Sequence, residues 1–179
     1  MKAALVLALG LLAVSASPAA PAFASFRITS ASDVHAGKAI PKRFTCDGND
    51  VAPKLVWRGV PKKAKELALV LEDPDAPGGT FTHWLTYGLS PSTTEWGRAG
   101  WAAYPPGGAA PRVGRNDFGR VGYSGPCPPP GQTHHYVFRL LALTRKLTLQ
   151  RGANRATFDR AVAHHVLAQA RLVAPYARH

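Results

Sequence analysis

Residues 67–84 read LALVLEDPDAPGGTFTHW, and this stretch decides how the chain folds. An apolar run, Leu67–Leu71, leads into a loop of prolines and glycines, and a second apolar run begins at His83. Short apolar runs bounded by turn residues are typical of buried strands. Because proline restricts φ, the loop between the runs is stiff. The stretch therefore predicts two strands and a rigid loop that brings titratable side chains to the start of the second strand.

Similar apolar runs bounded by turns occur elsewhere in the chain. The strongest covers 135–143, and weaker ones lie at 55–57 and 26–28. All of them are short, and glycine and proline dominate the segments between them. Many short strands with turn-rich connections favour an all-β architecture.

Helical spacing of apolar residues occurs only near the C-terminal end. It predicts a helix from Thr157 to Leu172, which would carry His164–His165, and Asn154 or Thr157 can cap its start. The predicted fold is therefore mainly β: an antiparallel β-sandwich with a C-terminal helix packed on it.

A second proline-rich loop follows the first about forty residues later. Residues 122–136 read GYSGPCPPPGQTHHY and lead into the strand at 135–143. Side chains two apart in a strand share a face, so His134 and Tyr136 should point the same way. If the two strands lie close together, these side chains converge with Asp73 and His83 on one small cavity. Gly125 would lie at the rim, where the lack of a side chain lets a ligand approach its N–H.

This set of residues suits an anion. The Tyr136 hydroxyl, the Gly125 N–H and the His134 ring can donate hydrogen bonds, while Asp73 can orient His83 or accept from an ammonium group. A phosphorylated head group that carries an amine would satisfy both halves of the set. The alternative is structural: Asp73 caps a turn and the histidines are satisfied residues at strand ends.

The chain resembles the phosphatidylethanolamine-binding protein family, particularly its bacterial branch of Raf-kinase-inhibitor-like proteins. The matching runs follow the family's order over nearly all of the chain after residue 24: 45–48, 55–57, 73–77, 83–84, 116–119, 122–123, 125–129 and 134–136. The resemblance implies a β-sandwich with a small pocket for phosphate, phosphorylated groups or phospholipid head groups. The pocket residues that carry over are Asp73, His83, Gly125, His134 and Tyr136, with Pro74 and Trp84 as walls.

Three other readings of these loops compete with a binding pocket. Residues 122–126 approach the nucleophile elbow of hydrolases around Ser124, but a proline-rich loop follows where that motif needs a helix. Cys127 beside His134 offers a thiol-histidine pair for small esters. Asp73, His83 and His134 offer a metal site of two histidines and one carboxylate, although they come from separate segments. We expect no catalytic residue, no metal and no cofactor.

A protein partner is a further expectation, because the family name suggests that the chain modulates or inhibits another protein. A surface-acting protease or kinase inhibitor would dock through the loop at 112–120. The formal net charge of +12 attracts anionic partners in general. The basic residues are dispersed and match no nucleic-acid motif, so we expect no specific nucleic-acid partner.

The first 24 residues have the features of a cleaved secretory signal. Lys2 precedes an apolar run over 3–14, which is shorter than the roughly 20 residues that span a bilayer. An Ala-x-Ala pattern ends at Ala24. Cleavage there leaves 25–179 as a single domain that is periplasmic or secreted, with no transmembrane segment.

Two cysteines, Cys46 and Cys127, remain after cleavage. An exported chain enters an oxidising compartment, where the two can form a disulfide. Two buried free thiols are the alternative. Zinc is disfavoured because neither cysteine has a second one at ligand spacing.

Overall fold

The computed structural model describes residues 25–31, 33–97 and 110–178. The predicted signal segment, 1–24, lies outside these residues. Every strand expected from the sequence coincides with an observed one. The elements in chain order are β1 Arg27–Ala31, the 3₁₀ helix η1 Lys42–Phe44, β2 Leu55–Arg58, β3 Glu66–Asp73, β4 Phe81–Leu89, β5 Glu95–Trp96, β6 Arg112–Val113, β7 Thr133–Leu143, α1 Arg155–Val162 and β8 Val166–Ala177.

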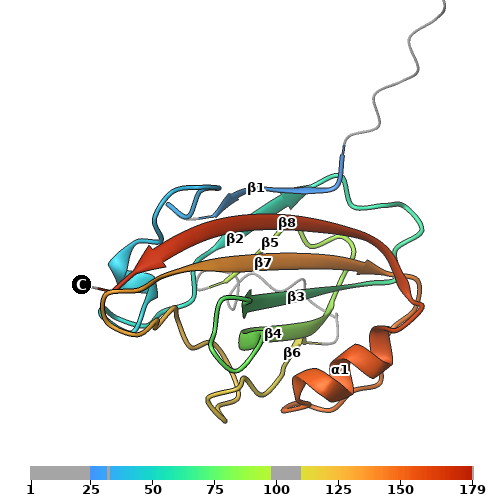
Figure 1. Ribbon diagram of the computed structural model, residues 1–179. Coiled ribbons are helices and arrows are strands. Elements are labelled where there is room, and N and C mark those ends of the chain that lie inside the picture. Colours follow the sequence, from blue (N-terminus) through green and yellow to red (C-terminus); the bar gives the residue numbers. More distant parts are fainter. Residues whose placement is uncertain (1–24, 32, 98–109, 179) are drawn as a thin grey trace, which may run out of the picture.

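The strands form two antiparallel sheets (Figure 1). The smaller has the order β1-β2-β5 and the larger the order β6-β4-β3-β7-β8. All eight residues of the central strand β3 are buried, and the apolar run Leu67–Leu71 predicts this for its five middle residues. Figure 1 shows β1 and α1 on opposite sides of the larger sheet. The prediction of a mainly β fold with antiparallel sheets and a helix near the C-terminus is confirmed.

Two hydrophobic cores lie on the two faces of the larger sheet. The inner core lies between the sheets and contains Leu69 and Leu71 together with Trp57 of β2. The outer core contains Val70 of β3 and Phe158 of α1. Successive residues of a strand point to opposite faces, so β3 contributes to both cores in turn. The helix therefore covers the face of the sheet that the smaller sheet leaves open.

The helix is much shorter than the sequence predicts. Asn154 caps it as expected, with its side-chain oxygen accepting the Thr157 N–H at 2.9 Å. The helix nevertheless ends at Val162, and His164 has a φ of 63°. The predicted continuation to Leu172 is wrong, because those residues belong to β8, and His164–His165 lie between helix and strand.

Pairing with β7 explains this difference. β8 is in register with β7 from Thr133↔Ala177 to Ala142↔Ala168, and after an irregularity Leu143 pairs with Val166, so β8 gains a long ladder of backbone hydrogen bonds. Its buried residues alternate, with Ala170 and Leu172 in the inner core. Local spacing alone does not distinguish this pattern from a helix when small residues fill the gaps, and tertiary pairing decides the outcome.

The end of β8 is fastened to a distant part of the chain. The Tyr176 hydroxyl donates to Asp47 Oδ2 at 2.8 Å, and Arg178 Nε donates to Asp47 Oδ1 at 3.0 Å. Hydrogen bonds from both groups lower the pKa of Asp47, that from Tyr176 most. The last residues are thus held against the loop that follows η1. In the described part of the chain, no helix has the length and apolar character needed to cross a membrane.

Candidate functional site

The candidate site starts from an irregularity in β4. Strand pairing joins Leu71 to Trp84 and Glu72 to Thr82, so His83 is an extra residue that forms a β-bulge. A bulge re-aims side chains and is frequent beside binding sites. The His83 ring lies 5.2 Å from the Tyr136 ring, while the adjacent Trp84 belongs to the inner core. The bulge thus turns two consecutive side chains toward the same side of the sheet.

Backbone carbonyls hold the His83 ring in place. Its Nδ1 lies 2.9 Å from the Ser124 oxygen and 3.0 Å from the Gly125 oxygen. Because carbonyl oxygens only accept, Nδ1 carries the hydrogen and the opposite nitrogen, Nε2, is left for another group. Burial lowers the pKa of His83, and the two carbonyls and the Asp73 charge only partly oppose this. A neutral His83 therefore presents Nε2 as an acceptor.

The carboxylate of Asp73 pairs with His134 rather than with His83. Asp73 Oδ2 lies 2.7 Å from His134 Nδ1, and both side chains are buried. The other oxygen, Oδ1, accepts the Asp75 N–H at 2.9 Å, so Asp73 also caps its turn as the structural alternative expected. Gln132 Oε1 lies 3.1 Å from His134 Nε2. The site thus contains an oriented imidazole beside a carboxylate.

Tyr136 contributes a buried hydroxyl with an unmet hydrogen bond. It is fully buried, and its hydroxyl makes no hydrogen bond of good geometry within the described residues, although the Asp73 carboxylate and the Cys127 backbone lie near enough to act on its pKa. Burial raises the pKa of Tyr136, and the nearby Asp73 charge raises it further. The hydroxyl is therefore protonated and can donate. Buried polar groups without a partner are rare in native proteins and call for an explanation.

Gly125 has a different role from the one expected. Its N–H, predicted to face an anion, donates instead to Asp50 Oδ1 at 2.6 Å. A Cβ built on it would lie 2.2 Å from the Phe44 carbonyl oxygen and 2.8 Å from Thr45 Cα. The glycine thus permits close packing of two loops, and its carbonyl contacts His83. The expectation of a free backbone N–H at this position is wrong.

A disulfide joins these two loops. Cys46 and Cys127 are bonded, with their Cα atoms 5.4 Å apart and a sequence separation of 81. The Cys46 N–H also donates to the Pro126 oxygen at 3.1 Å. The pairing that the sequence left open is therefore observed, and Cys127 has no thiol for the ester chemistry considered above.

Ser124 is held as part of the loop. Its Oγ accepts the Asn116 amide at 2.9 Å, and its N–H donates to the His83 oxygen at 3.1 Å. An amide cannot act as a general base, so this partner does not activate the hydroxyl. Among the described residues, no group of three or more His, Cys, Asp or Glu side chains is placed to hold a metal ion, and Asp73, His83 and His134 do not form such a group.

An aromatic cluster flanks His83, and sequence reasoning missed it. Phe118 lies 4.7 Å from Phe81 and 5.4 Å from His83, measured between ring centroids. Phe118 is 47% exposed, so the cluster reaches the surface. Of the two predicted walls, Pro74 is exposed and Trp84 is buried with its ring 5.5 Å from that of Tyr123. The Asn116–Gly119 run was the one signal that pointed to Phe118.

Known proteins share this arrangement of sheets and loops. The family described as phosphatidylethanolamine-binding protein matches residues 30–177. A UPF0098 protein of Methanothermobacter thermautotrophicus is 44% identical over 142 residues, which cover 78% of this chain and 91% of the relative. The Mycobacterium tuberculosis protein named putative lipoprotein LppC is 43% identical over 159 residues, which cover 87% of this chain and 75% of that relative.

Solved structures agree with the sequence comparison. The crystal structure of Escherichia coli YbcL, described as a member of the mammalian PEBP family, has a TM-score of 0.77 and 29% identity, and the match covers 87% of this chain and all of that one. The match of the family over residues 30–177, the identity to the relatives and the shared fold lead to one conclusion. The chain belongs to the phosphatidylethanolamine-binding protein family.

Proposed function

We propose that this chain is a non-catalytic binding protein that takes phosphate, a phosphorylated group or a phospholipid head group at the site formed by Asp73, His83, His134 and Tyr136. Pro74 and Trp84 form walls, and Gly125 holds His83 through its carbonyl. Membership of a family named for binding phosphatidylethanolamine supports this class of ligand.

The buried Tyr136 hydroxyl carries the proposal. It is a protonated donor that makes no hydrogen bond of good geometry among the described residues, and it lies next to the ring of His83, whose Nε2 is also unused there. A phosphate ester with one proton can form hydrogen bonds with both groups. Its unprotonated oxygen accepts a hydrogen bond from the Tyr136 hydroxyl, and its P–OH donates one to His83 Nε2. Asp73 retains lone pairs that can accept from the amine of a head group.

Titration calorimetry with phosphorylethanolamine tests this assignment. We expect Tyr136→Phe to weaken binding by about 10- to 100-fold, the size of one lost hydrogen bond to a charged group. Tyr87→Phe is the matched control, because the Tyr87 hydroxyl donates to Gln150 on the outer side of the sheet. Equal affinity of the Tyr136→Phe and parent proteins would refute the pocket. Hydrolysis of an ester by the parent protein that is lost in the Ser124→Ala protein would instead support the alternative that the chain is a hydrolase.

The proposed location is the periplasm or the exterior of the cell. The signal-like residues 1–24, the disulfide and a relative named as a putative lipoprotein support export. Mass spectrometry of the protein from its native host tests this, with Ser25 expected at the mature N-terminus. An intact Met1 would contradict cleavage.

A protein partner is the second candidate, and one observation favours it. Phe118 is exposed beside the site, and Arg115 and Arg120 are exposed on the same loop. An exposed aromatic flanked by arginines is typical of protein interfaces. Pull-down from native periplasm with the parent and with Phe118→Ser tests the idea, with Phe118→Ser expected to lose the partner. Retention of every captured protein by the variant would contradict it.

A further inference from the structure

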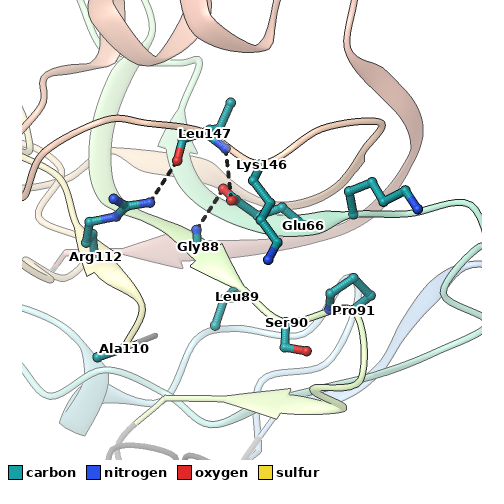
Figure 2. Close-up of a pocket in the computed structure, with 10 residues that line it drawn as sticks. Glu66, Gly88, Leu89, Ser90, Pro91, Ala110, Arg112, Lys146 and Leu147 are labelled. Atoms are coloured by element: carbon teal, nitrogen blue, oxygen red, sulfur yellow. Dashed lines mark hydrogen bonds between the residues drawn. The ribbon is translucent and has the colours of Figure 1, made fainter. Parts of the chain in front are cut away.

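A second polar cavity lies at the other end of β3 (Figure 2). Glu66 begins β3 and Asp73 ends it, a separation of about 23 Å for seven residue steps in a strand. The cavity has a volume of about 270 Å³. This is just below the roughly 300 Å³ at which pockets for drug-sized ligands begin. It suits a small organic molecule, and neither the family resemblance nor the proposed function uses it.

Three cationic side chains line this cavity: Lys65, Arg112 and Lys146. None of them forms an ion pair within the part of the chain that the structure describes. The two lysines are exposed, so their ammonium groups are accessible to a ligand. Figure 2 shows Lys146 extending over Glu66 and Arg112 at the opposite wall. The cluster is thus a concave concentration of positive charge rather than a set of paired surface residues.

The arginine is held in a fixed position. Arg112 Nη2 donates to the Leu147 oxygen at 2.8 Å, and the guanidinium carbon lies 5.9 Å from the centre of the Tyr87 ring. A cation positioned over an aromatic ring gains further attraction. One wall of the cavity is therefore pre-organised before any ligand enters, which lowers the entropic cost of binding.

Glu66 is the acidic residue of the cavity, and backbone groups already satisfy it. Oε1 accepts the Gly88 N–H at 2.8 Å and Oε2 accepts the Leu147 N–H at 3.0 Å (Figure 2). Glu66 is 4% exposed, and burial raises its pKa. Its role is thus to hold β4 and the 144–149 loop together. The charges of Arg112 and Lys146 attract Glu66, but none of the ion pairs among the described residues involves it.

From this geometry we propose that the cavity binds a small organic dianion, such as a four-carbon dicarboxylate. Three cations and one carboxylate give a formal charge of +2, which a dianion balances. Apolar surface from Leu89, Pro91 and Leu147 lines the same space and can contact an aliphatic spacer between two acidic groups. That apolar surface favours an organic acid over an inorganic ion. The site is independent of the proposed head-group site.

Succinate is the probe for this site. The mature chain is labelled with ¹⁵N and titrated at low salt, and we expect the amide signals of Gly88 and Leu147 to shift with saturation. Lys65→Gln combined with Lys146→Gln should weaken binding about tenfold or more, because two charge-assisted contacts are lost. Both lysines are exposed, so the fold should be unaffected. Raising the salt concentration should also weaken binding.

The matched control combines Lys62→Gln with Lys63→Gln, which removes the same charge from exposed residues outside the cavity. It should bind succinate like the parent protein. If both double variants bind succinate equally more weakly than the parent protein, the effect comes from the overall charge and not from this cavity, and the proposal is overturned. About 10 mM succinate would saturate most of a site with a Kd near 1 mM. Amide signals of Gly88 and Leu147 that do not shift at this concentration would also overturn the proposal. Tyr136→Phe and the lysine variants separate the two sites, since each should affect one ligand only.

Discussion

Substituting Gly125 by alanine distinguishes its structural role from a role in ligand access. If the glycine served only to admit a ligand, Gly125→Ala would reduce binding and leave stability unchanged. The structure predicts the opposite order of effects. The added Cβ would meet the Phe44 carbonyl oxygen at 2.2 Å, and this neighbour is backbone and cannot rotate away. The loop must therefore shift against a segment to which the disulfide ties it.

The expected cost has two parts. Overpacking of a well-filled site costs about 1–3 kcal/mol. The shift also lengthens the 2.6 Å hydrogen bond from the Gly125 N–H to Asp50, a charged acceptor, worth about 1.5–3 kcal/mol. We expect a loss of about 3–5 kcal/mol in the free energy of unfolding, a large fraction of a typical total of about 5–15 kcal/mol.

Urea unfolding of the oxidised protein measures this loss. Gly78→Ala is the matched control, because a Cβ there meets nothing within 4 Å and the residue lies in the other proline-glycine loop. It should change the free energy of unfolding by about 1 kcal/mol or less, in the stabilising direction. A Gly125→Ala protein as stable as Gly78→Ala would refute the packing role of Gly125.

Three further predictions concern the site, the disulfide and the helix. Burial lowers the pKa of His83, so an NMR titration of its ring should give a pKa below the ordinary 6.5. Because the unfolded chain then binds the proton more tightly than the folded chain, the free energy of unfolding should fall as the pH drops below 6.5. This fall should be smaller in the His83→Gln protein. Replacing both Cys46 and Cys127 by alanine opens a loop of about 81 residues and should lower the free energy of unfolding by about 4.5 kcal/mol, from the loss of chain entropy that the disulfide imposes on the unfolded state. Urea unfolding measures this loss, and an unchanged midpoint of the urea transition would contradict it. Phe158→Ala should lower the free energy of unfolding by about 3–5 kcal/mol, because Phe158 is 1% exposed in the outer core. Leu167→Ala is the control and should lower it far less, because Leu167 is 38% exposed. Similar losses in the two variants would show that α1 is not packed as described.

The strands could be predicted from local sequence because their signals are local. The run Leu67–Leu71 is apolar throughout and becomes the buried centre of β3. His134 and Tyr136 share a face because side chains alternate wherever a strand has no bulge, and β7 has none between these residues. The segment after Val162 is different, since its alanine-rich spacing fits a helix and a strand equally. Only the pairing of β8 with β7 decides between them, and that pairing involves residues far away in sequence.

The site residues could be gathered from the sequence, but their partners could not. The sequence offered Asp73 two roles, and the observed contact with His134 depends on the register between β3 and β7. The bulge at His83 leaves no mark in the sequence, yet it determines where the ring points. The sequence analysis singled out Gly125 for the approach of a ligand, but the groups that approach it are the backbone of Phe44 and Thr45.

The fastening of the last strand has a consequence for how the molecule is made. β8 completes the larger sheet, and the contacts of Tyr176 and Arg178 with Asp47 span 129 and 131 positions. Contacts so distant in sequence make folding slow. The larger sheet cannot close while residues 166–177 are still inside the ribosome, so the nascent chain stays open until these residues have emerged. If the chain is exported as proposed, late closure of the sheet would leave it unfolded for long enough to pass through a narrow export channel.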